Sequence, residues 1–105
     1  MADLAVIKYI IKETENVWRF IFEAPMYDKL DYTPGQLVNL FLKTPMDSVP
    51  HVRSYSIASY PDGTNTFELI ITDQPGGKMS DFLFRNADKG TEIGYSGPMG
   101  VFTLP

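Results

Sequence analysis

The stretch HVRSYSIAS, residues 51–59, concentrates side chains that could do chemistry: a cation at Arg53, a phenol at Tyr55, and hydroxyls at Ser56 and Ser59. The stretch alternates as a strand does, so Arg53 and Tyr55 lie on one face and Ser56 on the other face or at a bulge. An arginine pairs with phosphate through charge-assisted hydrogen bonds, and a tyrosine stacks on a planar ring. Taken singly, Arg53 is better explained as a surface arginine, and Tyr55 equally well as an interfacial barrel tyrosine. Together they suit a ligand with an anionic part and a flat aromatic part.

A second candidate binding element is the pair Gly76–Gly77, which precedes a predicted helix at 78–86. The first amides of a helix lack intrahelical partners and carry partial positive charge, so they can hold a phosphate. The glycines let the backbone approach an anion closely, and Ser80 adds a hydroxyl one turn into the helix. A Gly-Gly junction before a helix is more often a simple loop closure. This element is therefore a candidate phosphate site only if Arg53 reaches the same anion.

These residues must be positioned by a mostly β scaffold. The helix has Met79, Phe82 and Leu83 at i, i+3 and i+4, on one face. Runs rich in Val, Ile, Phe and Trp, separated by turn residues, predict six strands, at 4–12, 17–23, 37–43, 52–59, 66–73 and 91–96. Because strands and helices do not alternate, we expect an all-β fold, a closed or nearly closed six-stranded antiparallel barrel with one α-helix.

Composition limits the function further. The chain has 105 residues, 44% of them hydrophobic, which predicts one domain over 1–105. Its net charge of −4 argues against a general nucleic-acid binder or a binder of anionic membranes. There is no cysteine and one histidine, His51, so thiolate or multi-imidazole metal sites are excluded. The N-terminus lacks a basic, uninterrupted signal sequence, and no stretch reaches the ~20 apolar residues of a membrane span, so we expect a cytoplasmic protein.

Four ordered segments carry a resemblance to a known family. RSYSIAS matches an R-x-Y-S-x-x-S flavin motif, and YTPGQLVNLFL resembles a P-G-Q strand. PGGKMSDFLF resembles a G-x-x-S phosphate segment, and SGPMGVFTLP a G-P-x-G-x-F closing segment. Together they resemble the FAD-binding domain of the ferredoxin–NADP reductase superfamily over residues 4–105.

The resemblance implies a six-stranded antiparallel Greek-key barrel with a capping helix that binds FAD, with FMN the less favoured flavin. Arg53 would bind the flavin phosphates, Tyr55 would pack against the isoalloxazine and ribityl chain, and Ser56 would be the catalytic residue near flavin N5. Ser59 completes the motif and is expected to be structural. Residues of the phosphate segment and of the preceding strand would complete the site: Gly76, Gly77, Lys78, Met79, Ser80, Ile70, Ile71 and Thr72.

The resemblance also implies partners. Complete reductases continue into an NAD(P)H-binding domain, and this chain ends at Pro105 without a G-x-G-x-x-G segment. We therefore expect the isolated chain to bind flavin without acting on NAD(P)H. In the complete system the electrons would pass to an iron–sulfur or haem protein. Two alternatives remain open, a non-enzymatic barrel that serves as an interaction module and a barrel that binds phosphates or nucleotides generally.

Overall fold

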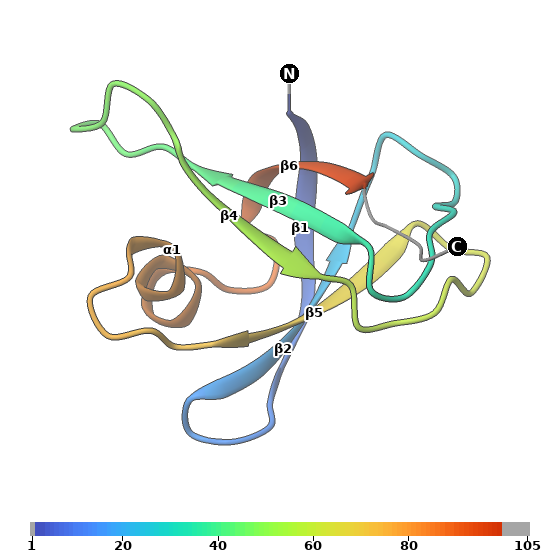
Figure 1. Ribbon diagram of the computed structural model, residues 1–105, viewed down its shortest axis with the longest axis horizontal. Helices are drawn as coiled ribbons and strands as arrows, with labels where there is room; N and C mark the ends of the chain where they lie inside the picture. The colour runs from blue at the N-terminus through green and yellow to red at the C-terminus, as the bar shows by residue number, and fades with distance from the viewer. Residues whose placement is uncertain (1, 100–105) are drawn as a thin grey trace, which may run out of the picture.

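The structure, a computed structural model, describes residues 2–99. Its backbone forms one six-stranded sheet and one short helical segment (Figure 1). The strands are β1 Asp3–Lys12, β2 Val17–Glu23, β3 Leu37–Leu42, β4 His51–Ser56, β5 Thr66–Thr72 and β6 Glu92–Met99. The helical segment is α1 Lys78–Asp81, followed directly by a π-helix, Phe82–Asn86.

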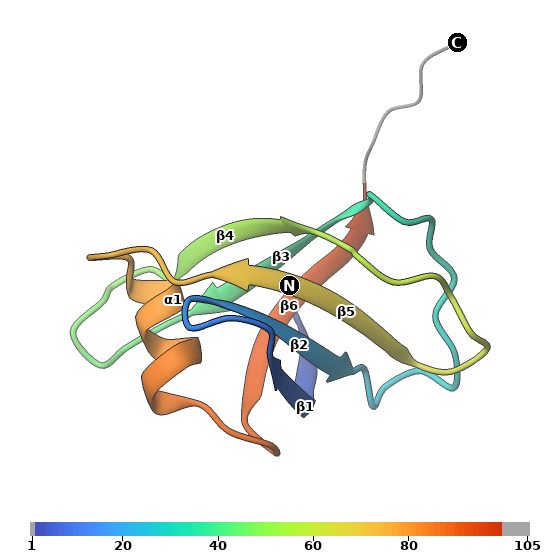
Figure 2. The same cartoon turned by 90° about the horizontal axis from the view of Figure 1, so that it is seen from below.

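The strand order is β4-β3-β6-β1-β2-β5, and every neighbouring pair is antiparallel. Strand β6 returns to lie beside β1, which gives the Greek-key order expected from the resemblance. In Figure 2 the sheet curls around the interior, with the helix covering one end. The prediction of six antiparallel strands and one helix is confirmed.

The interior is filled from alternate positions of the strands. Phe20 and Phe22 of β2 are fully buried, and so is Leu69 of β5. Phe22 stacks on Phe67 with 5.3 Å between ring centroids, and Phe67 packs on Tyr95 of β6 at 5.5 Å. Burial at alternate positions fixes the register of these strands, because a slip of one residue would expose the whole set.

Of the two forms expected, a closed or a nearly closed barrel, the structure has the one that is not fully closed. The two edge strands, β4 and β5, approach each other only just beyond the end of β4. There Ile57 and Leu69 form an isolated bridge, and the Ala58 amide donates to the Glu68 carbonyl at 2.8 Å. Strand β4 therefore ends at Ser56 rather than at the predicted residue 59. Toward the beginning of β4, away from this bridge, β4 and β5 diverge.

The helical segment covers that open end. Met79 and Leu83, four residues apart, are 2% and 0% exposed and enter the core, whereas Phe82 is half-buried. The segment has the predicted length, but its second half winds as a π-helix. Within the described residues, no helix is long and apolar enough to cross a membrane. Residues 100–105 of the predicted closing segment lie outside the described residues.

Candidate functional site

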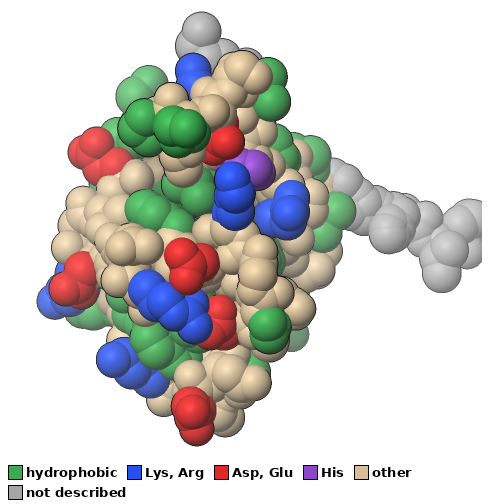
Figure 3. Space-filling model, turned by 90° about the vertical axis from the view of Figure 1, so that its left-hand side faces the viewer, with side chains coloured by type: hydrophobic (Ala, Val, Ile, Leu, Met, Phe, Trp, Pro, Cys, Tyr) green, Lys and Arg blue, Asp and Glu red, His purple; other side chains and the backbone are tan. Residues whose placement is uncertain are grey.

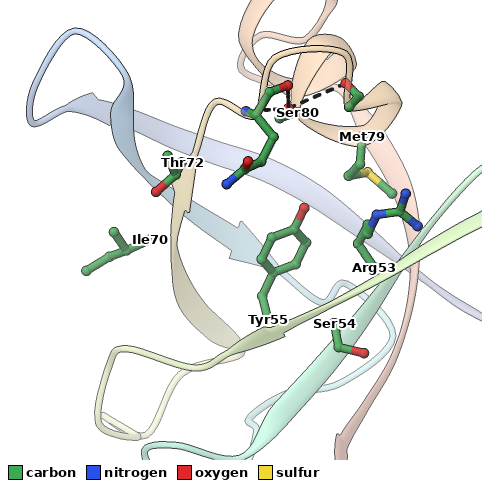
Figure 4. A pocket seen from close by; sticks show the side chains of 9 residues that line it. Arg53, Ser54, Tyr55, Ile70, Thr72, Met79 and Ser80 are labelled. Carbon is green, nitrogen blue, oxygen red and sulfur yellow. Dashed lines mark hydrogen bonds between the residues drawn. The ribbon is translucent and has the colours of Figure 1, made fainter.

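A cavity of about 300 Å³ lies where β4 and β5 diverge, next to the beginning of α1 (Figure 4). Its walls come from three segments that are distant in sequence: β4, the end of β5 with the following loop, and the first turn of the helix. The lining residues are Arg53, Ser54, Tyr55, Ile70, Thr72, Gln74, Gly77, Met79 and Ser80. Seven of the eleven residues expected at the site thus line one cavity.

The two strands that flank the cavity are sheet edges. In the described sheet β4 pairs with β3 alone, and β5 pairs with β2 alone. Past the Ile57–Leu69 bridge, the outer edges of both strands therefore present backbone N–H and C=O groups that the sheet does not use. A polar ligand placed between the strands can take up these groups.

Arg53 supplies the positive charge at the cavity. Its side chain is exposed, and Nη1 donates to the neighbouring Val52 carbonyl at 2.8 Å. Among residues 2–99, no carboxylate forms an ion pair with it. Figure 4 shows the guanidinium beside Met79, close to the first turn of the helix. The cation is thus free to pair with an anion at that turn.

Tyr55 supplies an aromatic surface. As the alternation predicts, its side chain lies on the same face of β4 as that of Arg53, whereas the Ser54 side chain points away (Figure 4). The ring is half-buried and packs against the core. Burial raises the pKa of the Tyr55 phenol, and the Arg53 charge partly offsets this. The phenol is therefore neutral at physiological pH and can both stack and donate a hydrogen bond.

The loop that leads into the helix is held by Ser80. The Ser80 hydroxyl, in a side chain only 4% exposed, accepts from the Gln74 amide at 2.9 Å and faces the Gln74 carbonyl at 3.2 Å. The Gly77 amide donates to the same carbonyl at 2.9 Å. The expected role of Ser80 as a hydroxyl donor to phosphate thus competes with bonds that this hydroxyl already makes within the loop.

The glycine pair has two distinct uses. Gly76 has a φ of +78°, a left-handed conformation that glycine adopts without strain. A Cβ on Gly77 would lie 3.2 Å from Gln74 and from the Ser80 hydroxyl, so the tight packing of the loop favours glycine there. The first helical hydrogen bond runs from the Asp81 amide to the Gly77 carbonyl at 3.0 Å. The preceding amides of the first turn come before this ladder and can face an anion.

Four expected residues lie outside the cavity lining. Ser56 is exposed at the end of β4, opposite Leu37 of β3, and Ile71 is 1% exposed within the core. Gly76 and Lys78 line a neighbouring hollow of about 400 Å³ on the other side of the loop. Of the three β5 residues expected at the site, Ile70 and Thr72 line the cavity, whereas Ile71 does not.

Ser59 has a structural place. Its hydroxyl lies 2.8 Å from the Tyr32 hydroxyl and accepts from the Glu68 amide at 3.1 Å. These bonds fasten the segment after β4 onto β5, next to the Ile57–Leu69 bridge.

Sequence reasoning missed Gln74 and Ser54. Gln74 lines both hollows, and the signal available was its place directly before the Pro-Gly-Gly turn. Ser54 stands between the two motif residues, and its hydroxyl donates to Asn39 of β3.

Asp47 connects the loop before β4 to the helix. One of its carboxylate oxygens lies 3.0 Å from His51 Nε2 and accepts from the Thr44 hydroxyl at 2.6 Å, while the other lies 3.8 Å from Lys78 Nζ. The hydrogen bond from Thr44, with help from the charges of His51 and Lys78, lowers the pKa of the Asp47 carboxyl. In Figure 3 the single histidine (purple) lies beside basic side chains and an acidic one. Asp47 thus lies near the ammonium of Lys78.

Comparison with known proteins identifies the family. The family described as "Oxidoreductase FAD-binding domain" matches residues 4–104. The chain belongs to this family. The glycine betaine monooxygenase reductase subunit of Pseudomonas aeruginosa is 38% identical over 89% of this chain and 25% of its own length. Ferredoxin–NADP reductase B of Sorangium cellulosum is 42% identical over 80% of the chain and 29% of its own length.

A solved structure agrees on the fold. The flavohem-like FAD/NAD-binding domain of nitric oxide dioxygenase from Vibrio cholerae superposes with a TM-score of 0.86 at 20% identity, over 99% of this chain and 46% of that one. The chain therefore spans about a quarter of the length of the curated relatives it matches, and about half of this structural neighbour.

The residues at the cavity fit FAD, the cofactor of the family. An unpaired guanidinium and first-turn amides suit the phosphates, and a half-buried tyrosine ring suits the isoalloxazine. Unused edge groups of β5 suit the polar atoms of a flavin. Among residues 2–99 no cluster of acidic and histidine side chains could hold a metal ion.

Proposed function

We propose that this FAD-binding domain is part of an NAD(P)H-dependent electron-transfer reductase. The bound flavin would accept a hydride and release its electrons singly to an iron–sulfur or haem protein. The reductase names of the relatives at 38% and 42% identity support this. The observation that carries the proposal is that Arg53 and Tyr55 share one cavity with the first turn of the helix.

Each residue has a role that follows from its place. Arg53 and the amides of residues 78–80 would hold the phosphates, so that an acidic chain needs no broad basic surface. Tyr55 would form one wall against the isoalloxazine and restrict its orientation. The free edge of β5 at 70–72 would accept and donate hydrogen bonds along the flavin. Ser80 would hold the loop through Gln74.

Ser56 is proposed as the residue that affects chemistry at flavin N5. Ser56 is exposed and directly follows Tyr55 at the end of β4. A hydroxyl at that atom can donate or accept a hydrogen bond and so influence proton transfer there. This role needs the flavin ring to extend past Tyr55 toward the end of the strand.

The domain is expected to act with partners. An NAD(P)H-binding domain, in the same chain or another, would deliver the hydride, and a redox protein would accept the electrons. We expect the 105-residue chain alone to bind FAD without oxidising NAD(P)H. A complete reductase would require the additional sequence that the longer relatives contain.

The first test is the visible absorbance spectrum of the purified chain before and after incubation with excess FAD or FMN, once free flavin has been removed. Retention of FAD with a perturbed spectrum is the expected result, with FMN retained less. Riboflavin serves as the control that lacks phosphate. A chain that retains none of these flavins, even with the nucleotide-binding domain attached, would leave the barrel as an interaction module. A chain that retains ADP but no flavin would point to general phosphate binding.

A further inference from the structure

Another hollow, of about 300 Å³, lies at the opposite end of the helical segment from the cavity that Arg53 and Tyr55 line. That cavity is the site proposed above for FAD and is called the FAD cavity below. It is formed by the end of β1, the beginning of β2, the π-helix and the turn that follows it. Its lining residues are Tyr9, Ile10, Lys12, Trp18, Phe84, Ala87, Asp88 and Lys89. None of these residues lines the FAD cavity.

The floor of the hollow is apolar and firmly supported. Trp18 stacks on Phe84 with 4.3 Å between ring centroids and 25° between planes. Phe84 in turn meets buried Phe20 edge-on at 5.8 Å. Tyr9, which follows a bulge in β1, is 49% exposed at the rim. A large aromatic surface thus stays accessible on a rigid base.

The rim is basic. Lys12 Nζ lies 4.7 Å from the centroid of the Trp18 ring. Lys89 Nζ and Lys8 Nζ lie 5.2 Å and 5.9 Å from the centroid of the Tyr9 ring. Each ammonium is attracted to a ring face, which is a weak interaction at exposed sites.

Lys12 and Lys89 line the hollow together with one acidic residue, Asp88. The ion pairs of residues 2–99 use Arg19, His51, Lys78 and Arg85 as cations, and none involves these two lysines. On a chain of net charge −4, two lysines beside one carboxylate are a local excess of positive charge. A basic rim on an acidic protein attracts an acidic partner and orients it.

We propose that this hollow docks an acidic segment of a partner protein. Carboxylates of the segment pair with Lys12 and Lys89, and an apolar side chain between them rests on Trp18 and Phe84. A duplex nucleic acid or an anionic membrane fits less well, because both need a broader cationic surface than two lysines on a chain of charge −4. The apolar floor also has no counterpart in a phosphate backbone.

The docking proposal stands apart from the proposed redox function. The hollow and the FAD cavity share no lining residue, so a segment bound here leaves Arg53 and Tyr55 accessible. Flavin binding and acidic-segment binding can therefore fail independently. An electron acceptor that binds this surface would contact the protein at the end of the helical segment and not at the FAD cavity.

The chain contains its own reporter, because Trp18 is the single tryptophan and lies in the hollow. The probe is a blocked pentapeptide with two glutamates on each side of a phenylalanine; its glutamine analogue is the uncharged control. Tryptophan emission is followed during titration, with and without saturating FAD, at about 20 and about 200 mM NaCl. The expected result is a saturable change with the glutamate peptide that weakens in salt and is absent with the glutamine peptide.

Variants locate the binding surface. Calorimetric titration of the double variant Lys12→Gln/Lys89→Gln should show affinity for the peptide about threefold to thirtyfold lower. The matched control, Lys29→Gln/Lys43→Gln, removes the same charge from two other exposed lysines and should bind as the parent does. Equal losses in both double variants, no response to the glutamate peptide, or tighter binding of a DNA duplex or of phosphatidylserine vesicles would each overturn the proposal. FAD binding by both variants checks that the fold is intact.

Discussion

Ile57 and Leu69 form the bridge at which the two edge strands of the sheet meet, and the cavity that Arg53 and Tyr55 line begins where the strands part beyond it. The backbone of β4 does not pair with β5 along this strand, so the sheet stays open there. A ligand can therefore reach the side chains of Arg53 and Tyr55 between the two strands. The open side of the barrel is thus the cofactor site of the proposed function.

Arg53→Ala should weaken FAD binding most among the cavity variants. Loss of a charge-assisted contact costs about 1.5–3 kcal/mol, or about tenfold to 150-fold in the dissociation constant. Flavin fluorescence titration measures this, with Lys29→Ala as a control at an exposed lysine outside the cavity lining. Riboflavin, which lacks phosphate, should bind both variants alike. If Arg53→Ala held FAD as tightly as the parent, the phosphate assignment would be wrong.

Ser56→Ala should leave the FAD dissociation constant within about twofold, because its hydroxyl is proposed to act on chemistry and not on affinity. The rate at which NAD(P)H reduces the flavin, measured by stopped flow in a protein that includes the nucleotide-binding domain, should fall by roughly tenfold or more. Ser54→Ala is the matched control, since that neighbouring hydroxyl bonds to Asn39 on β3. Equal rates in parent and Ser56→Ala would remove Ser56 from the proposed chemistry.

Ser80→Ala should lower the free energy of unfolding by about 1–3 kcal/mol, because the Gln74 amide then loses its buried acceptor. Urea unfolding of the flavin-free chain measures the change, and Ser48→Ala at an exposed loop position provides the comparison. FAD affinity should fall as well, since the loop that presents the first-turn amides loosens. Unchanged stability together with weaker FAD binding would instead indicate that the Ser80 hydroxyl serves the phosphate directly.

Tyr95 places a hydroxyl in the core where, among the described residues, no group forms a hydrogen bond with it. Burial, helped by the charge of Asp3, raises the pKa of Tyr95 to about 12. The fold therefore favours the neutral phenol, so this contribution is complete below the ordinary tyrosine pKa near 10. It is lost as the pH rises from there toward 12, by about 2–3 kcal/mol.

Tyr95→Phe should accordingly be neutral or stabilising by about 1 kcal/mol at pH 7. It should also flatten the fall in stability at alkaline pH, measured by urea unfolding at a series of pH values. Tyr60→Phe, at a ring that is 78% exposed, is the matched control. A large loss of stability in Tyr95→Phe would show that the hydroxyl has a partner, such as a buried water.

Gly97→Ala should destabilise the fold more than Gly63→Ala. Both glycines have positive φ, +115° and +83°, so alanine carries a backbone penalty of about 1 kcal/mol at each. At Gly97 the new Cβ would also lie 2.8 Å from the Leu37 carbonyl oxygen of β3, whereas nothing lies within 4 Å at Gly63. The added clash should cost a further 1–3 kcal/mol or so in urea unfolding. Equal losses at the two positions would mean that β3 and β6 can separate without cost.

The sequence by itself determined the local structure and the chemistry of the site. The apolar run within residues 66–73 predicts a strand, and in the structure one face of that strand buries Phe67, Leu69 and Ile71 together. The side-chain types at Arg53 and Tyr55 define a ligand with an anionic part and an aromatic part. Both conclusions rest on properties of neighbouring residues, which a sequence displays directly.

Only the tertiary structure decided which of these residues meet. The order β4-β3-β6-β1-β2-β5 puts β4 and β5 at the two edges and leaves the barrel open there. Packing between residues far apart in the sequence determines this order. The direction of the Ser80 hydroxyl toward Gln74, and the place of Gln74 in the cavity wall, likewise depend on how the loop closes onto the helix. Hydrogen bonds of this kind join atoms brought together only after the chain has folded, so no spacing along the sequence predicts them.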